Sequence, residues 1–178
     1  MRKSETGNET EIRVNNEAQI EILSLGAGIA IDDSKMQRKV LAKILAFTGI
    51  ADERISVVGS TADDIRDFEA MVARHVREHP DDHHLVIVDE ILDIQQECGG
   101  HLVVSGSQTI AALRRTLSAE DLEGKLLAIV RSASDSAVDV AVFRDRAHGF
   151  IEKSSLRRDK ILETLAPIWL ARFPRAPT

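Results

Sequence analysis

The sequence predicts an α/β protein in which a five-stranded parallel sheet has helices on both faces. Five short apolar runs alternate with five stretches whose apolar residues recur at helical spacing. Such alternation with short connections is typical of a parallel sheet that winds right-handedly. The run at 85–88 contains four consecutive apolar residues with no polar alternation, which is typical of a strand buried on both of its faces.

The two ends of the chain are expected to lie outside this domain. Residues 1–27 are mostly polar and offer no apolar face wide enough to bury, so we expect an N-terminal tail or linker that is partly disordered. Residues 19–25 alternate apolar and polar side chains, which leaves an added strand or short helix open. The domain itself is expected at 28–172, followed by a C-terminal tail at 173–178.

Two strand–helix units open the domain. The first apolar run, 28–31, is followed by a helix that Ser34 can cap and Gly49 can end. The second run, 55–59, precedes a helix that continues to about Glu78. The candidates for the cap of this second helix are Ser60 and Thr61.

Three further units complete the alternation. The strand at 85–89 is followed by residues 92–106, which contain two adjacent glycines and no clear periodicity and are expected to form a long functional or mobile loop. Strands are expected at 126–130 and 149–152, and a last helix from about residue 156 to 172. The candidate caps in this half are Ser107 for one helix, and Ser134 or Asp135 for the next.

Composition excludes several kinds of partner. The net charge of −6 gives no electrostatic reason to expect binding to nucleic acid or to an anionic membrane. No apolar stretch approaches the roughly 20 residues of a membrane span, and the polar start is no signal peptide. The single Cys98 excludes an internal disulfide framework and fits a reducing compartment. We therefore expect a soluble, cytoplasmic protein.

Four of the five expected strands end on side chains suited to phosphoryl chemistry. Asp32 and Asp33 follow the first strand, Asp89 ends the third, and Ser132 and Lys153 follow the fourth and fifth. The carboxyl ends of parallel strands share one edge of the sheet, so these residues should be neighbours.

Such a group of residues predicts a cation site that can also bind phosphate. Three adjacent carboxylates repel one another unless a cation lies between them, and oxygen ligands of this kind suit Mg²⁺. A carboxylate beside the ion can attack phosphorus. The hydroxyl and ammonium groups can then hold phosphoryl oxygens.

The chain resembles the receiver domains of two-component response regulators, of the chemotaxis-regulator type. The matching segments are Ile31-Asp-Asp-Ser34, Val86-Ile-Val-Asp89, Ile129-Val-Arg-Ser-Ala133 and Gly149-Phe-Ile-Glu-Lys153. The resemblance covers essentially everything except the tails. It implies a flavodoxin-like fold with strand order 2-1-3-4-5.

The resemblance also implies a role for each site residue. Asp89 would accept a phosphoryl group from a phosphohistidine on a histidine kinase or histidine phosphotransfer protein. Ser132 and Lys153 would contact that group, and Phe150 would be the switch aromatic that follows the Ser132 hydroxyl. The Mg²⁺ ligands would be Asp32, Asp33, Asp89 and the backbone carbonyl near Ile91. The family is a signalling module and no conventional enzyme, and a homodimer stays open.

Three features depart from the family pattern. Ser154 stands where the family usually has Pro, often after a cis bond, which is costly without Pro. The loop at 92–106 is roughly ten residues longer than usual by our reading of the pattern. Arg131 adds a cation beside Ser132; an extra contact to the phosphate stays open, and we expect the side chain to be solvated.

Two other functions stay open at this point. The insertion or the missing Pro could have disabled the switch, which would leave a receiver-like interaction module that is not phosphorylated. A phosphohydrolase with an Asp nucleophile on a related sheet is the third reading. Mg²⁺ binding and turnover of small phosphate esters separate the three.

Overall fold

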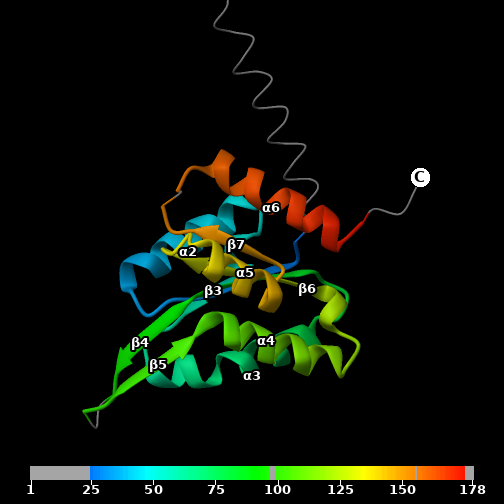
Figure 1. Ribbon diagram of the computed structural model, residues 1–178. Coiled ribbons are helices and arrows are strands. Elements are labelled where there is room, and N and C mark those ends of the chain that lie inside the picture. Colours follow the sequence, from blue (N-terminus) through cyan, green and yellow to red (C-terminus); the bar gives the residue numbers. More distant parts are fainter. Residues whose placement is uncertain (1–24, 97–98, 155, 175–178) are drawn as a thin grey trace, which may run out of the picture.

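A five-stranded parallel sheet forms the centre of the molecule (Figure 1). The computed structural model describes residues 25–96, 99–154 and 156–174, and all structural statements below concern these residues. The sheet strands are β1 (Ala27–Ile31), β2 (Ile55–Val58), β3 (His84–Asp89), β6 (Leu126–Ser132) and β7 (Gly149–Glu152). Their order is β2-β1-β3-β6-β7 and every neighbouring pair is parallel. Counted within this sheet the order is 2-1-3-4-5, so the predicted flavodoxin-like fold is confirmed.

Five helices cover the two faces of the sheet (Figure 1). They are α2 (Lys35–Phe47), α3 (Ala62–Glu78), α4 (Gly106–Ser118), α5 (Ala137–Arg146) and α6 (Arg158–Arg172). Two single 3₁₀ turns, η1 (Asp52–Arg54) and η2 (Glu123–Lys125), precede β2 and β6. Apolar side chains of α2 and α6 pack on one face, and those of α3, α4 and α5 pack on the other.

The central strands supply alternate side chains to these two cores. In β3, Leu85 and Ile87 face α2 and α6, whereas Val86 and Val88 face α3 and α4. All four are fully buried, and each such side chain contributes about 1.5–3 kcal/mol relative to an exposed position. Two-sided burial explains why this run lacks polar alternation.

The helix caps agree only in part with the sequence. Ser34 caps α2, and Thr61 caps α3 in a reciprocal capping box with Asp64. The expectation that Ser107 caps α4 is wrong, because Ser105 occupies that position. Neither Ser134 nor Asp135 caps α5, since the chain turns into the helix later and Ser136 is the cap.

Residues 92–106, expected to be a loop, mostly form a β-hairpin, so that expectation is wrong. Strands β4 (Ile91–Gln95) and β5 (His101–Ser105) pair antiparallel as a separate sheet. The hairpin projects beyond the edge of the main sheet beside α3 (Figure 1). Its inner face packs against the core under α3 and α4, through Leu92, Ile94, Leu102 and Val104.

Several sequence expectations concern residues outside the described ones. Residues 1–24, which include most of the expected tail and of the alternating segment at 19–25, belong to this group. Cys98 and residues 175–178 belong to it as well. None of the described helices combines the length and the apolarity that crossing a membrane requires.

Candidate functional site

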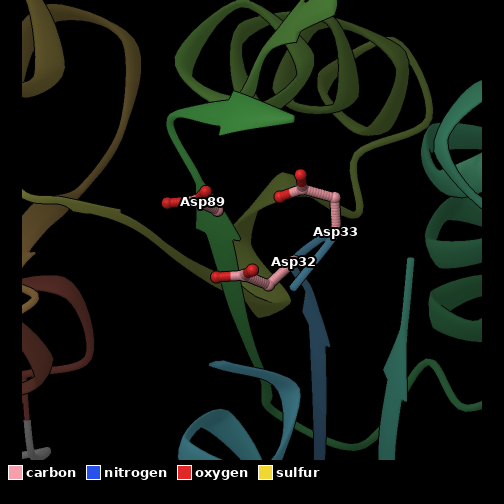
Figure 2. Close-up of side chains that lie close together, drawn as sticks. All are labelled: Asp32, Asp33 and Asp89. Carbon is pink, nitrogen blue, oxygen red and sulfur yellow. The ribbon is translucent and has the colours of Figure 1, made fainter. Parts of the chain in front are cut away.

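Neighbouring strands bring three carboxylates together at the carboxyl edge of the sheet. Asp32 and Asp33 follow β1, and Asp89 is the last residue of β3. Because β1 and β3 pair in parallel register, the strand ends lie side by side. One carboxylate oxygen from each residue lies within 4.8 Å of those of the other two (Figure 2). The structure thus groups the acidic residues that the sequence singled out.

The turn after β1 is held by hydrogen bonds that the sequence does not reveal. The Ser34 N–H donates to Asp32 Oδ1 at 2.9 Å. Nη1 of Arg38 donates to the carbonyls of Asp32, Asp33 and Gly59 at 3.0, 2.8 and 3.0 Å. Arg38 therefore ties the acidic turn to the loop after β2.

Gly59 permits the close approach of these two loops. Its φ is 113°, and a Cβ at this position would lie 2.4 Å from the carbonyl oxygen of Asp32. A side chain would have to displace the backbone that carries the acidic pair, so only glycine suits this position.

Lys153 points into the acidic group from the end of β7. Its N–H donates to the Ser132 carbonyl at 2.9 Å, which extends the pairing of β6 and β7. Its Nζ lies 2.6 Å from Asp89 Oδ1 and 4.0 Å from Asp32 Oδ2. The structure therefore brings Lys153 to the Asp89 carboxylate, as the strand-end pattern predicts.

The other candidate residues lie around this centre at different depths. Ser132 ends β6 and is buried, and its Oγ accepts the Ser134 N–H at 3.1 Å. Phe150 in β7 is half-buried and stacks on Phe143 of α5, with ring centroids 5.4 Å apart. Ile91 begins β4 two residues after Asp89, and its side chain is exposed.

Burial raises the pKa values of two of the three carboxyl groups, those of Asp32 and Asp89. Desolvation raises the pKa of Asp89 to about 6; Lys153 opposes the shift and Asp32 adds to it. Desolvation also raises the pKa of Asp32, against the Ser34 N–H and the Lys153 charge. Asp32 Oδ2 is buried and has no hydrogen-bond partner among the described residues. An unpartnered buried oxygen amid three carboxylates fits the ligand set of a divalent cation such as Mg²⁺.

Arg131 is buried, so the expectation of a solvated side chain is wrong. Its exposure is 1%, and its Nη1 lies 3.8 Å from Asp32 Oδ2. Nη1 also donates to Gln37 Oε1 at 2.9 Å. Arg131 lies on the same face of β6 as Ile129, which faces α2 and α6. It is buried there because Gln37 and Asp32 supply polar partners under the helix.

Glu90, next to Asp89, is a residue of this region to which the sequence pattern assigned no role. Its Oε1 accepts the Ser105 hydroxyl and its Oε2 accepts the Ser107 N–H, both at 2.8 Å. The Ser107 hydroxyl also donates to Oε1, at 3.2 Å. Glu90, the residue that follows β3, thus binds the first turn of α4, although the hairpin separates the two in the sequence. The Ser-x-Ser spacing of residues 105–107, at the start of α4, is the sequence signal that could have indicated this contact.

Comparison with known proteins identifies the fold. The sequence matches no family model and no curated protein. Among solved structures, the signal receiver domain of the response regulator NarL from Mycobacterium tuberculosis is 17% identical with a TM-score of 0.53, over 82% of this chain and 97% of that one. A response regulator protein from Burkholderia multivorans is 25% identical with a TM-score of 0.51, over 86% of this chain and 99% of that one.

The chain has the response regulator receiver fold. The CheX–CheY–BeF3–Mg²⁺ complex from Borrelia burgdorferi has a chain of this fold, 16% identical with a TM-score of 0.50, over 81% of this chain and 89% of that one. The Lys153–Ser154 peptide bond is trans, since no cis peptide occurs among the described residues. The resemblance seen in the sequence is confirmed at the level of the receiver fold.

Proposed function

We propose that this chain is a phosphoacceptor receiver domain of a two-component phosphorelay, and that Asp89 accepts the phosphoryl group. The single observation that carries the proposal is the meeting of Asp32, Asp33, Asp89 and Lys153 at one edge of the sheet. The receiver fold of the structural neighbours supports it. The proposed donor is a phosphohistidine on a histidine kinase or a histidine phosphotransfer protein, and the proposed location of the reaction is the cytoplasm.

The reaction needs a carboxylate nucleophile and charge stabilisation around it. An Asp89 oxygen forms a bond to phosphorus while the phosphorus–nitrogen bond breaks, and the imidazole nitrogen keeps the electron pair. Water later attacks phosphorus, the bond to the Asp89 oxygen breaks, and inorganic phosphate leaves. The chain assists both steps on its own side chain and turns over no separate substrate.

The surrounding residues position and stabilise the transferred group. Asp32, Asp33, Asp89 and the backbone carbonyl of Ile91 would hold Mg²⁺, which supplies positive charge between the carboxylates and the phosphoryl oxygens. Lys153 neutralises one phosphoryl oxygen from its position beside Asp89. The Ser132 hydroxyl, which accepts the Ser134 N–H, donates its own proton to another phosphoryl oxygen.

Movement of Ser132 toward the phosphoryl group would be transmitted through Phe150. Phe150 stacks on Phe143 of α5, so a change in its rotamer alters the contact between β7 and α5. The surface formed by α5, β7 and α6 is therefore the proposed output surface for a partner protein or a homodimer. Val138 of α5 is 74% exposed there, which suits a contact made in one state only.

The proposal is tested by phosphorylation with acetyl phosphate and MgCl₂, followed by intact mass measurement. The wild type should gain one phosphoryl group that hydroxylamine removes, and Asp89→Asn should gain none. Asp93→Asn is the matched control, because Asp93 is an exposed carboxylate nearby that lies 2.9 Å from His101 Nδ1. An Asp89→Asn variant labelled as fully as the wild type would overturn the proposal.

Two further measurements on the wild type separate the remaining alternatives: a Mg²⁺ titration and an assay of phosphate release from small esters. An interaction module that is not phosphorylated would form no adduct and need not bind Mg²⁺. A phosphohydrolase would release phosphate from small esters over many turnovers. Either result contradicts the receiver role.

A further inference from the structure

Arg131 adds a second cation to the acidic site. The three carboxylates of the site are accompanied by the Lys153 ammonium and by the Arg131 guanidinium. Lys153 is partly exposed, with 26% of its side chain accessible, whereas only 1% of the Arg131 side chain is accessible. A guanidinium keeps its charge at neutral pH. Its charge is therefore a fixed part of the site.

The position of Arg131 is set by three elements. In the β3–β6 register it is paired with Asp89, which brings it to the phosphoacceptor strand. Its Nη1 donates to Gln37 of α2. The same Nη1 lies 3.8 Å from Asp32 Oδ2, the buried oxygen that has no hydrogen-bond partner among the described residues. Arg131 is therefore the nearest cation to that oxygen, since Lys153 lies 4.0 Å from it.

A divalent cation and Arg131 would neutralise the same oxygen. With both cations counted, three negative and two positive charges leave a net charge of −1 in the site; without Arg131 the net charge would be −2. A site of lower negative charge attracts Mg²⁺ less, and the ion and the guanidinium repel each other across a few ångströms of buried space. Arg131 Nε is also buried without a hydrogen-bond partner among the described residues, so Gln37 anchors this guanidinium only through Nη1.

We propose that Arg131 is an internal counter-ion of Asp32 that competes with Mg²⁺ and sets a weak affinity for the ion. This inference rests on the proposed function, because it concerns the same site. In the metal-free protein Arg131 compensates Asp32. When Mg²⁺ binds, the guanidinium gives up this contact and keeps its hydrogen bond to Gln37. Arg131 is a positioning residue and does not itself react.

The test measures Mg²⁺ dissociation constants by isothermal titration calorimetry. Arg131→Met keeps much of the side-chain length and removes the charge, and it should bind Mg²⁺ about tenfold more tightly than the wild type. Arg131→Lys keeps the charge and should stay within about threefold. Arg144→Met is the matched control, because Arg144 is an exposed residue of α5 and the change in net charge is the same. An unchanged or weaker affinity of folded Arg131→Met would overturn the inference.

A second measurement on the wild type does not depend on the folding of any variant. The guanidinium resonances of Arg131, assigned through bonds from its backbone, should shift as Mg²⁺ saturates the site. Resonances that stay unchanged at saturation contradict competition. If the wild type neither binds Mg²⁺ nor accepts a phosphoryl group, the proposed function fails with this inference. If it does both and Arg131→Met binds Mg²⁺ like the wild type, only the role of Arg131 is wrong.

Discussion

Asp89 is held in a buried setting that disfavours its charged form. Its side chain is 3% exposed, and burial together with Asp32 outweighs the Lys153 ammonium 2.6 Å away. A carboxyl that folds with a raised pKa binds a proton more readily in the folded than in the unfolded state. Between about pH 4 and pH 6, stability therefore falls as pH rises, and the loss is complete above that range.

Asp89→Asn should consequently stabilise the metal-free protein at pH 8. The amide resembles the protonated carboxyl, so we expect the free energy of unfolding to rise by about 1–3 kcal/mol. The gain should shrink as pH falls from 6 toward 4, because the wild-type carboxyl becomes protonated in the folded state over that range. Urea unfolding at pH 8 and pH 4 measures both values. A variant that is less stable than the wild type at pH 8 contradicts this account of Asp89.

The sequence reveals a site residue only where a local pattern indicates which residues will surround it. Asp32, Asp89 and Lys153 each follow an apolar run, and a shared sheet edge follows from that pattern alone. The burial of Arg131 depends on Gln37 and Asp32, which approach it from another helix and another strand. No local pattern around Arg131 contains those partners, so a charged residue there was expected in solvent.

At the level of elements, Glu90 joins the strand β3, which ends at Asp89, to the helix α4. Its carboxylate accepts the hydroxyl of Ser105, which caps α4, and the N–H of Ser107 in the first turn. A carboxylate at a helix N-terminus satisfies free N–H groups and opposes the helix dipole. The orientation of α4 and the base of the hairpin therefore depend on one side chain.

Glu90→Ala should destabilise the fold by about 1–2 kcal/mol, because it leaves the Ser107 N–H and two hydroxyls without their acceptor. Glu53→Ala is a suitable control, since Glu53 is an exposed residue of η1 and should change stability by less than about 0.5 kcal/mol. Both values come from urea unfolding at pH 7. Equal effects of the two substitutions would show that the Glu90 contacts contribute nothing.

The hairpin was missed because its periodic signal is short. Each strand offers only two inward apolar residues, Leu92 and Ile94 in β4 and Leu102 and Val104 in β5. The outward positions include both apolar and charged residues, among them Ile91 and Asp93. Two alternations per strand are too few to distinguish a ribbon from a loop. The strands β1, β3 and β6 are buried at every residue, and this two-sided burial made their apolar runs continuous and easy to find.

For the molecule as a whole, the edge opposite the acidic site carries its own polar group. The carboxylate of Glu123, in the turn η2 before β6, accepts hydrogen bonds from Arg114 of α4 and Arg172 of α6, and His148 Nε2 lies 2.9 Å from it. The Ala128 N–H donates to His148 Nδ1, so the neutral ring carries its proton on Nε2. These contacts join helices from both faces of the sheet.

His148 should make stability depend on pH in the direction opposite to Asp89. Burial, with Arg114 and Arg172, lowers the pKa of His148 to about 4, while the unfolded chain titrates near 6.5. The unfolded state therefore binds the extra proton first, and wild-type stability is lost as pH falls from about 6.5 to 4.

His148→Gln removes this titration and tests the assignment. The variant should be less stable than the wild type at pH 7.5, and the difference should narrow by up to about 3 kcal/mol as pH falls to 4. Chemical unfolding across this pH range gives the two curves. Parallel curves would mean that His148 does not titrate differently in the folded and unfolded states.

The backbone of Glu90 makes hydrogen bonds both to the main sheet and to the residue that follows the hairpin. The Glu90 N–H donates to the Arg131 carbonyl, and the Gly106 N–H donates to the Glu90 carbonyl at 2.9 Å. The residues that precede and follow the hairpin, Glu90 and Gly106, are therefore joined directly by one hydrogen bond. A change in the length of the hairpin or in its outward side chains should therefore leave the geometry of the acidic site unchanged.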